Sequence, residues 1–178
     1  MSEILSEHLF YRELQESDVT GKYVHWLNDP EINRYLEVRH VTQTIESCIE
    51  FVKEMNVDQS QHLFGIFLIQ NGEHIGNIKL GFINQYHLRG QLSLFIGDSN
   101  CWRKGYASEA IRAITKWGFD ELGLGKIEAG CCEENVASRN VFLNVGYKEE
   151  GFFREHALIN GQRIGSYWLG ILPNEISE

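Results

Sequence analysis

The chain has little proline, no long apolar run and no biased segment. Only two of its 178 residues are proline, and 43% are hydrophobic, so we expect little disorder. No apolar run approaches the roughly 20 residues that a membrane-spanning helix needs, and the N-terminus lacks the basic and apolar regions of a signal peptide. These absences predict a cytoplasmic protein without a membrane partner.

The cysteines and histidines show no metal-binding pattern. The four cysteines are Cys48, Cys101, Cys131 and Cys132, and none belongs to a CxxC pair. The seven histidines are scattered without the short spacing of a zinc site. We therefore expect reduced, packed thiols and no metal.

No linker or internal repeat divides the chain, and 178 residues are enough to bury a full core. We therefore expect one domain over residues 1–178. The phosphate-binding motifs GxGxxG and GxxxxGK[ST] are both missing, which argues against a nucleotide-binding domain.

The segment from Gln91 to Leu122 has the most informative pattern. An apolar run over 92–96 predicts a strand, and a polar loop with Gly105 leads into an amphipathic helix. The first turn of a helix leaves backbone N–H groups unpaired, and phosphate binds at such places. The segment is therefore a candidate anion site, although a strand, a glycine turn and a helix also occur as plain structure. The helical stripe consists of Ala107, Ala110, Ile111, Ile114, Trp117, Gly118 and Leu122.

A second strand and helix follow. Lys126 to Cys132 reads as a strand, and a short helix begins after Asn135, a good N-cap, and ends at Gly146, a good C-cap. Adjacent Cys131 and Cys132 would point to opposite faces of that strand.

Earlier segments predict two helices and a hairpin. One helix starts at Ser17 or Asp18 and stops near 28–30, and another spans the apolar positions 45–55. Asn71-Gly72 predicts a hairpin with a type I′ turn, and Asn160-Gly161 predicts a similar one between Phe152 and Leu172. The order of elements gives a mixed sheet with helices on both faces.

Together these segments resemble the GNAT superfamily of acetyl-CoA-dependent N-acyltransferases, in the group with ribosomal-protein N-terminal, spermidine and amino-sugar acetyltransferases. The resemblance rests on the segments Trp102–Ala110, Asn135–Ser138 and Val145–Gly151. The resemblance implies an α/β (α+β) fold with a mixed, largely antiparallel, twisted sheet of six to seven strands. It also implies helices on both faces and a splayed central strand pair.

The resemblance also implies where acetyl-CoA binds. The backbone of Leu94, Phe95 and Ile96 would pair with the pantetheine arm, and Asn135 would contact the arm from the neighbouring strand end. A plain helix cap remains an equal and compatible reading of Asn135. The pyrophosphate would be held by Trp102, Arg103, Lys104, Gly105, Tyr106, Ala107 and Ser108.

Two positions depart from the family pattern. Phe142 stands where many relatives have the tyrosine that protonates the leaving thiolate, and phenylalanine has no proton to give. Arg103 stands where glycine is usual. Its cation would attract phosphate, or its side chain would restrict the loop and weaken the site.

Acyl transfer to an amine needs a neutral amine, an oxyanion donor and a proton for the thiolate. A backbone N–H of residues 94–96 is the candidate oxyanion donor. Ser138 is the first substitute for the missing tyrosine, and Cys131 is the second; Glu133, beside Glu134, is the candidate general base. The alternative is that the serine is an ordinary helix residue and the two glutamates are surface charges.

The acceptor is predicted only broadly. Residues 1–60 carry twelve acidic and five basic side chains, a net charge of −7 out of −9 for the chain. An acidic groove favours a cationic amine and argues against nucleic acid, although a solvated acidic face is an equal reading. Tyr35 and Glu37 are the acceptor-side candidates. The alternative is that Tyr35 is an ordinary half-buried ring and Glu37 an ordinary surface carboxylate.

The sequence thus predicts an N-acetyltransferase that moves an acetyl group directly from acetyl-CoA to a primary amine. The acceptor would be a protein N-terminus, a polyamine or an amino sugar. A homodimer is possible. The alternative is a noncatalytic acyl-CoA-binding or regulatory module.

Overall fold

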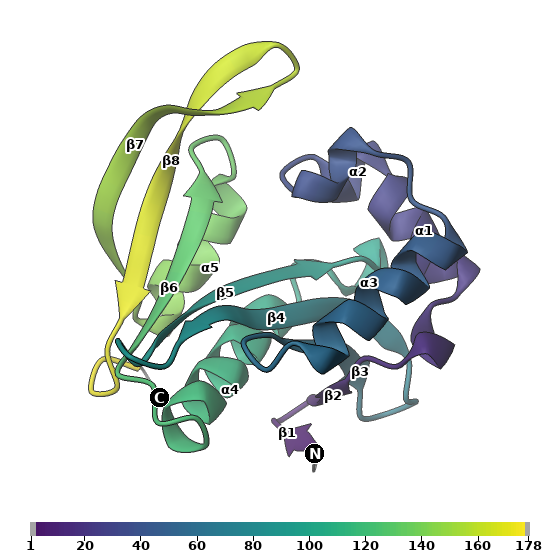
Figure 1. Ribbon diagram of the computed structural model, residues 1–178, viewed down its shortest axis with the longest axis horizontal. Helices are drawn as coiled ribbons and strands as arrows, with labels where there is room; N and C mark the ends of the chain where they lie inside the picture. The colour runs from purple at the N-terminus through teal and green to yellow at the C-terminus, as the bar shows by residue number, and fades with distance from the viewer. Residues whose placement is uncertain (1–2, 177–178) are drawn as a thin grey trace.

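The computed structural model describes residues 3–176, which form one mixed sheet covered by helices (Figure 1). The strand order is β1-β2-β3-β4-β5-β6-β8-β7, and every neighbouring pair is antiparallel except β5 and β6. This confirms the predicted fold class. The strands are β1 (Ile4–Leu5), β2 (Leu9–Glu13), β3 (His62–Leu68), β4 (His74–Asn84), β5 (Arg89–Ile96), β6 (Lys126–Cys132), β7 (Lys148–Ile159) and β8 (Gln162–Ile171).

Helices cover both faces of the sheet, with a separate buried cluster under each group. Ile111 and Ile114 of α4 and Phe142 of α5 pack with the larger cluster, whereas Tyr23 and Trp26 of α1 pack in the smaller one with α3. The helices are α1 (Gly21–Asn28), α2 (Pro30–Asn33), α3 (Ile45–Val57), α4 (Tyr106–Asp120) and α5 (Val136–Val145), with 3-10 turns η1 (Glu16–Asp18), η2 (Glu37–His40) and η3 (Ser99–Cys101).

The central strands β5 and β6 separate halfway along their length. They pair only from Arg89 opposite Lys126 to Gln91 opposite Glu128. Beyond that point β5 continues to pair with β4 as far as Ile96, and β6 continues to pair with β8 as far as Cys132. Because each strand follows its other neighbour, a gap opens between the two strand ends (Figure 1).

Three local expectations differ from the structure. The eighth strand is the two-residue β1, which is too short to give a periodic pattern. The first helix starts at Gly21 rather than Ser17 or Asp18, because the Thr20 hydroxyl caps it while η1 ends at Asp18.

The first predicted hairpin turn is also wrong in type. A type I′ turn needs positive φ at both central residues. Gly72 has φ 71°, but Asn71 is not among the residues with positive φ; at the second hairpin Asn160 and Gly161 have φ 49° and 78°, as predicted. The five residues between β3 and β4 make a longer loop than a two-residue turn.

Within residues 3–176, no helix is both long and apolar enough to cross a membrane, and no group of three or more His, Cys, Asp or Glu side chains is placed to hold a metal ion. All four cysteines are free thiols, and three of them are buried.

Candidate active site

The loop between β5 and α4 lies at the open end of the strand gap. Gly105 is the N-cap of α4 with φ 84°, and no side chain accepts a hydrogen bond from the first turn. The Trp102 indole Nε1–H donates to the carbonyl oxygen of Ile96 at 2.8 Å, which ties the loop to the strand end. The first N–H groups of α4 therefore remain available to an anion.

Arg103 adopts a left-handed backbone conformation, with φ 60°. This conformation costs a non-glycine residue roughly 1–2 kcal/mol. The position therefore suits the glycine that the family pattern has, and arginine occupies it at the expense of local strain.

A cavity of about 500 Å³ is lined by the end of β5, the α4 loop, the start of α5 and the segment over residues 31–36. Its walls come from four separate segments, and most of its exposed lining is apolar. It is lined by Glu31, Ile32, Tyr35, Leu36, Leu94, Phe95, Ile96, Cys101, Trp102, Arg103, Gly105, Tyr106, Ala107, Ser108, Asn135, Ala137, Ser138 and Val141.

Most of the residues expected at the site line this one cavity. All the expected cofactor residues do so except Lys104, and so do Tyr35 and Ser138. The cavity is not lined by Lys104, Cys131, Glu133 or Glu37. Glu31 also lines the cavity, although only Tyr35 and Glu37 are predicted from this region as acceptor-side candidates. Glu31 lies in α2 and Tyr35 in the turn that follows it.

Asn135 and Ser138 are held together at the start of α5. Asn135 Oδ1 accepts a hydrogen bond from the Ser138 backbone N–H at 3.2 Å, which confirms the predicted cap. The Ser138 hydroxyl lies 3.5 Å from Cys131 Sγ. Cys131 is 3% exposed, and its burial raises the pKa of the thiol, so it stays protonated.

Phe142 belongs to the core rather than to the cavity. Its side chain is 2% exposed, and its ring packs against Tyr147 at 5.0 Å between centroids. It is absent from the cavity lining.

The expected carboxylates are engaged outside the cavity. Glu133 Oε2 accepts from the Gly165 backbone N–H at 3.1 Å. Glu134 pairs with Arg34 at 3.0 Å. The Glu37 side chain is 88% exposed and pairs with Arg39 at 3.2 Å. Glu31 is the one carboxylate among the described lining residues.

Comparisons with known proteins agree with this architecture. The family model described as "Acetyltransferase (GNAT) domain" matches residues 8–148. The uncharacterized N-acetyltransferase YnaD of Bacillus subtilis is 30% identical, over 97% of this chain and 98% of that protein. The spermidine N(1)-acetyltransferase of Escherichia coli K12 is 28% identical, over 85% of this chain and 78% of that protein.

A solved structure supports the fold. The spermidine N-acetyltransferase of Vibrio cholerae, in complex with CoA and spermine, superposes with a TM-score of 0.86 and 23% identity, over 96% of this chain and 98% of that one. The fold, the family model and the relatives matched over nearly the whole chain all indicate a GNAT acetyltransferase. The chain belongs to the GNAT family and is an N-acetyltransferase of that family.

Proposed function

We propose that the protein binds acetyl-CoA in the cavity at the end of β5 and the starts of α4 and α5, and transfers the acetyl group directly to a primary amine. The observation that carries this proposal is the position of one cavity against both an unpaired strand edge and the uncapped start of α4. Its volume lies in the usual range for small-molecule sites.

The cavity offers a suitable group to each part of acetyl-CoA. Residues 92–95 have no β6 partner, so the edge of β5 there can pair with an extended arm as a strand edge does. The N–H groups at the start of α4 and the Arg103 guanidinium suit a pyrophosphate. When bound, acetyl-CoA supplies the activated thioester.

Residues of the chain provide the remaining chemistry. A backbone N–H of the strand over 94–96 stabilises the oxyanion. Ser138 relays a proton: its hydroxyl donates to the leaving thiolate and takes up the proton that the attacking amine releases, so the hydroxyl is restored. The buried Cys131 thiol holds the serine hydroxyl in place. Glu31 and Tyr35 receive the amine, because they line the same cavity opposite the strand end.

The proposed acceptors are a protein N-terminus, a polyamine or an amino sugar. The similarity to a spermidine acetyltransferase supports a small-molecule amine. A cytoplasmic location and a homodimer are part of the same proposal. The second candidate, a noncatalytic acyl-CoA-binding module, is favoured by Phe142, which cannot donate a proton, and by the strain at Arg103.

Calorimetric titration of acetyl-CoA into the protein tests the cofactor step, with an Arg103→Gly variant beside it. We expect micromolar binding at a stoichiometry near one. Failure of both proteins to bind contradicts the proposal. Binding by both without acetylation of any amine favours the noncatalytic module, and binding by the variant alone shows that Arg103 disables the loop.

A further inference from the structure

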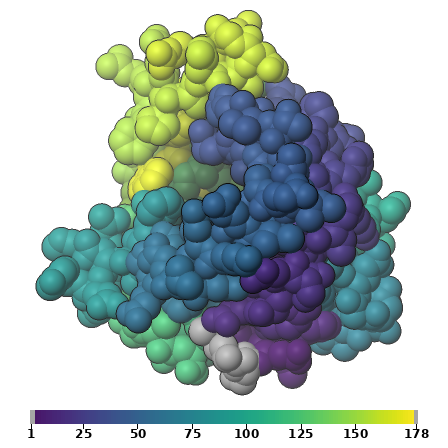
Figure 2. Space-filling view, turned by 45° about the vertical axis from the view of Figure 1, so that its right-hand side comes forward, coloured from purple at the N-terminus to yellow at the C-terminus, as the bar shows by residue number. Residues whose placement is uncertain are grey.

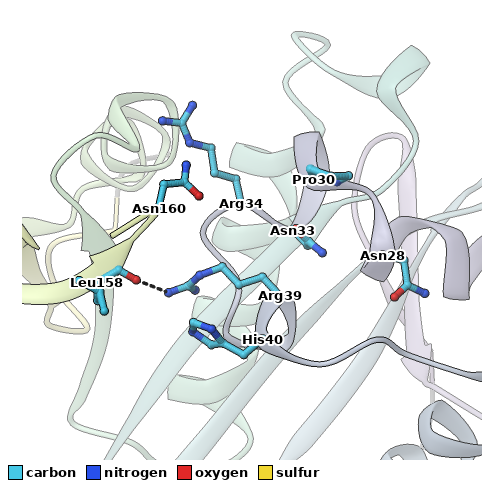
Figure 3. Close-up of a pocket in the computed structure, with 8 residues that line it drawn as sticks. All are labelled: Asn28, Pro30, Asn33, Arg34, Arg39, His40, Leu158 and Asn160. Carbon is cyan, nitrogen blue, oxygen red and sulfur yellow. Dashed lines mark hydrogen bonds between the residues drawn. The ribbon is translucent and has the colours of Figure 1, made fainter. Parts of the chain in front are cut away.

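A second cavity has a volume of about 550 Å³ (Figure 3). Its walls are the segment that carries α2 and η2 and the tip of the β7–β8 hairpin. Arg34, Arg39 and His40 line it together with three asparagines, and no carboxylate does. We call it the basic pocket.

The basic pocket contrasts with the charge of the segment that builds it. Residues 1–60 have a net charge of −7, which suggests an acidic groove. In the fold, however, two of the five basic side chains of this segment line one pocket. The carboxylates nearest to them, Glu37 and Glu134, lie outside the lining and are exposed.

Several hydrogen-bond donors in the pocket have no partner within residues 3–176. Arg34 makes one hydrogen bond, to Glu134, which leaves four of its N–H groups without a partner among the described residues. The His40 ring and the Asn160 amide have no hydrogen bond there either; the nearest carboxylate oxygen to His40 is that of Glu37, at 3.8 Å. A carboxylate or phosphate satisfies such donors.

Arg39 has a different role, because it closes the pocket wall. Its Nη1 donates to the Leu36 carbonyl oxygen at 2.8 Å, and its Nη2 lies 3.5 Å from the Leu158 carbonyl oxygen at the hairpin tip. Figure 3 shows this guanidinium spanning from η2 to the hairpin. Figure 2 shows the hairpin and the α2–η2 segment approaching each other above a hollow.

Arg34 of the basic pocket neighbours the 500 Å³ cavity in which we place acetyl transfer. The Arg34 guanidinium lies 5.1 Å from the centre of the Tyr35 ring, which lines that cavity. Its partner Glu134 precedes Asn135, which also lines the cavity. A ligand that fills both spaces would lie against this arginine.

We propose that the basic pocket binds an anionic group, a phosphate or a carboxylate, carried by the acceptor amine. The inference rests on the proposed acetyl transfer and narrows its acceptor to an amine that also bears a negative charge. It disfavours polyamines, which carry only positive charges and would face Arg34 and Arg39.

The pocket itself is tested first, by titrating inorganic phosphate and then succinate into ¹⁵N-labelled protein and following the amide signals. We expect saturable shifts at 33–40 and 158–161, apart from any at 102–108. Arg34→Gln and His40→Gln should each weaken this binding several-fold. Lys116→Gln, which removes a similar exposed cation paired with Asp120, should leave it unchanged. Absence of saturable shifts at 33–40 and 158–161 overturns the proposal.

The acceptor class is tested by comparing kcat/KM for aminoalkyl phosphates and amino acids of increasing chain length with unsubstituted alkylamines and spermidine. We expect the anionic amines to be preferred by about tenfold or more, and Arg34→Gln to abolish the preference through KM. A preference for spermidine, or one that survives Arg34→Gln, overturns the proposal.

Inhibition by free phosphate shows whether the anion bound in the pocket is part of the acceptor or a separate regulatory ligand. If the pocket serves the acceptor, phosphate inhibits competitively against the anionic amine alone. Equal effects on all amines overturn the acceptor role. Phosphate binding at the pocket without turnover of any amine contradicts the acetyl transfer instead, so the two failures are distinguishable.

Discussion

The helices α4 and α5 both begin at the 500 Å³ cavity, but their first turns differ. At α5 the Asn135 side chain accepts from the Ser138 N–H, so a residue of the chain satisfies the helix start. At α4 the N-cap is Gly105, and no side chain takes that place. A helix start that the chain leaves uncapped keeps its first N–H groups available to a ligand, whereas a capped start does not.

The first turn of α5 contributes a hydroxyl instead of free N–H groups. Replacing Ser138 with alanine should lower kcat by about 100-fold, because general acid catalysis typically contributes that much. Acetyl-CoA affinity should stay within about twofold. Steady-state kinetics and calorimetry measure the two effects.

Ser138→Thr is the matched control, since it keeps a hydroxyl at the same position. It should retain most of the activity. Full activity in Ser138→Ala would assign the proton to another group.

The first turn of α4 depends on the conformation of Gly105. Gly105→Ala forces a side chain into φ 84°, which should cost about 1–2 kcal/mol of stability and weaken acetyl-CoA binding by about tenfold as the loop shifts. Thermal unfolding and calorimetry check both values.

Gly123→Ala provides the comparison. Gly123 has φ 64° with open space for a Cβ, as Gly105 has, but it is absent from the cavity lining. The Gly123→Ala variant should lose a similar amount of stability and keep its affinity for acetyl-CoA. An equal loss of affinity in both variants would mean that the effect is not local to the α4 start.

The cap of α5 separates a structural role of Asn135 from a binding role. Asn135→Ala should lose about 1 kcal/mol of stability, and Asn135→Ser should not, because serine also caps helices. The Asn135 Nδ2 group has no hydrogen-bond partner among the described residues and lines the cavity. We therefore expect both variants to bind acetyl-CoA about fivefold more weakly, the value of one neutral hydrogen bond.

Urea unfolding and acetyl-CoA titration of the two variants distinguish the roles. Unchanged affinity in Asn135→Ser would leave Asn135 as a cap alone.

The smallest effect is expected at Arg103, two residues before the α4 cap. Arg103→Gly relieves the left-handed strain at φ 60° but adds backbone entropy to the unfolded chain. The free energy of unfolding of Arg103→Gly, measured in urea, should rise by about 0.5 kcal/mol. A loss of stability would show that contacts of the arginine side chain outweigh its strain.

Much of the fold follows from local patterns. The helical stripe of α4 predicts the buried positions Ala110, Ile111 and Ile114, which are fully buried. Asn135 and Gly146 mark the ends of α5 as expected. Such patterns are predictable because a helix depends on its own residues and caps.

The first hairpin and the charge of the acceptor side were less predictable. The turn at Asn71-Gly72 depends on where β3 stops pairing with β4, which lies outside the dipeptide itself. The acidic total of residues 1–60 also says nothing of where each charge points, and two of its arginines meet in one pocket.

Local sequence patterns were enough to predict most of the elements and their order, the loop that starts α4 and the family. Only the tertiary structure decided which segments meet at the cavity. The cavity exists because β5 follows β4 while β6 follows β8, and these pairings join residues far apart in the chain. Glu31, Tyr35 and Ser138 line one cavity as a result, and Glu133, which accepts from the Gly165 N–H, is not among its lining residues.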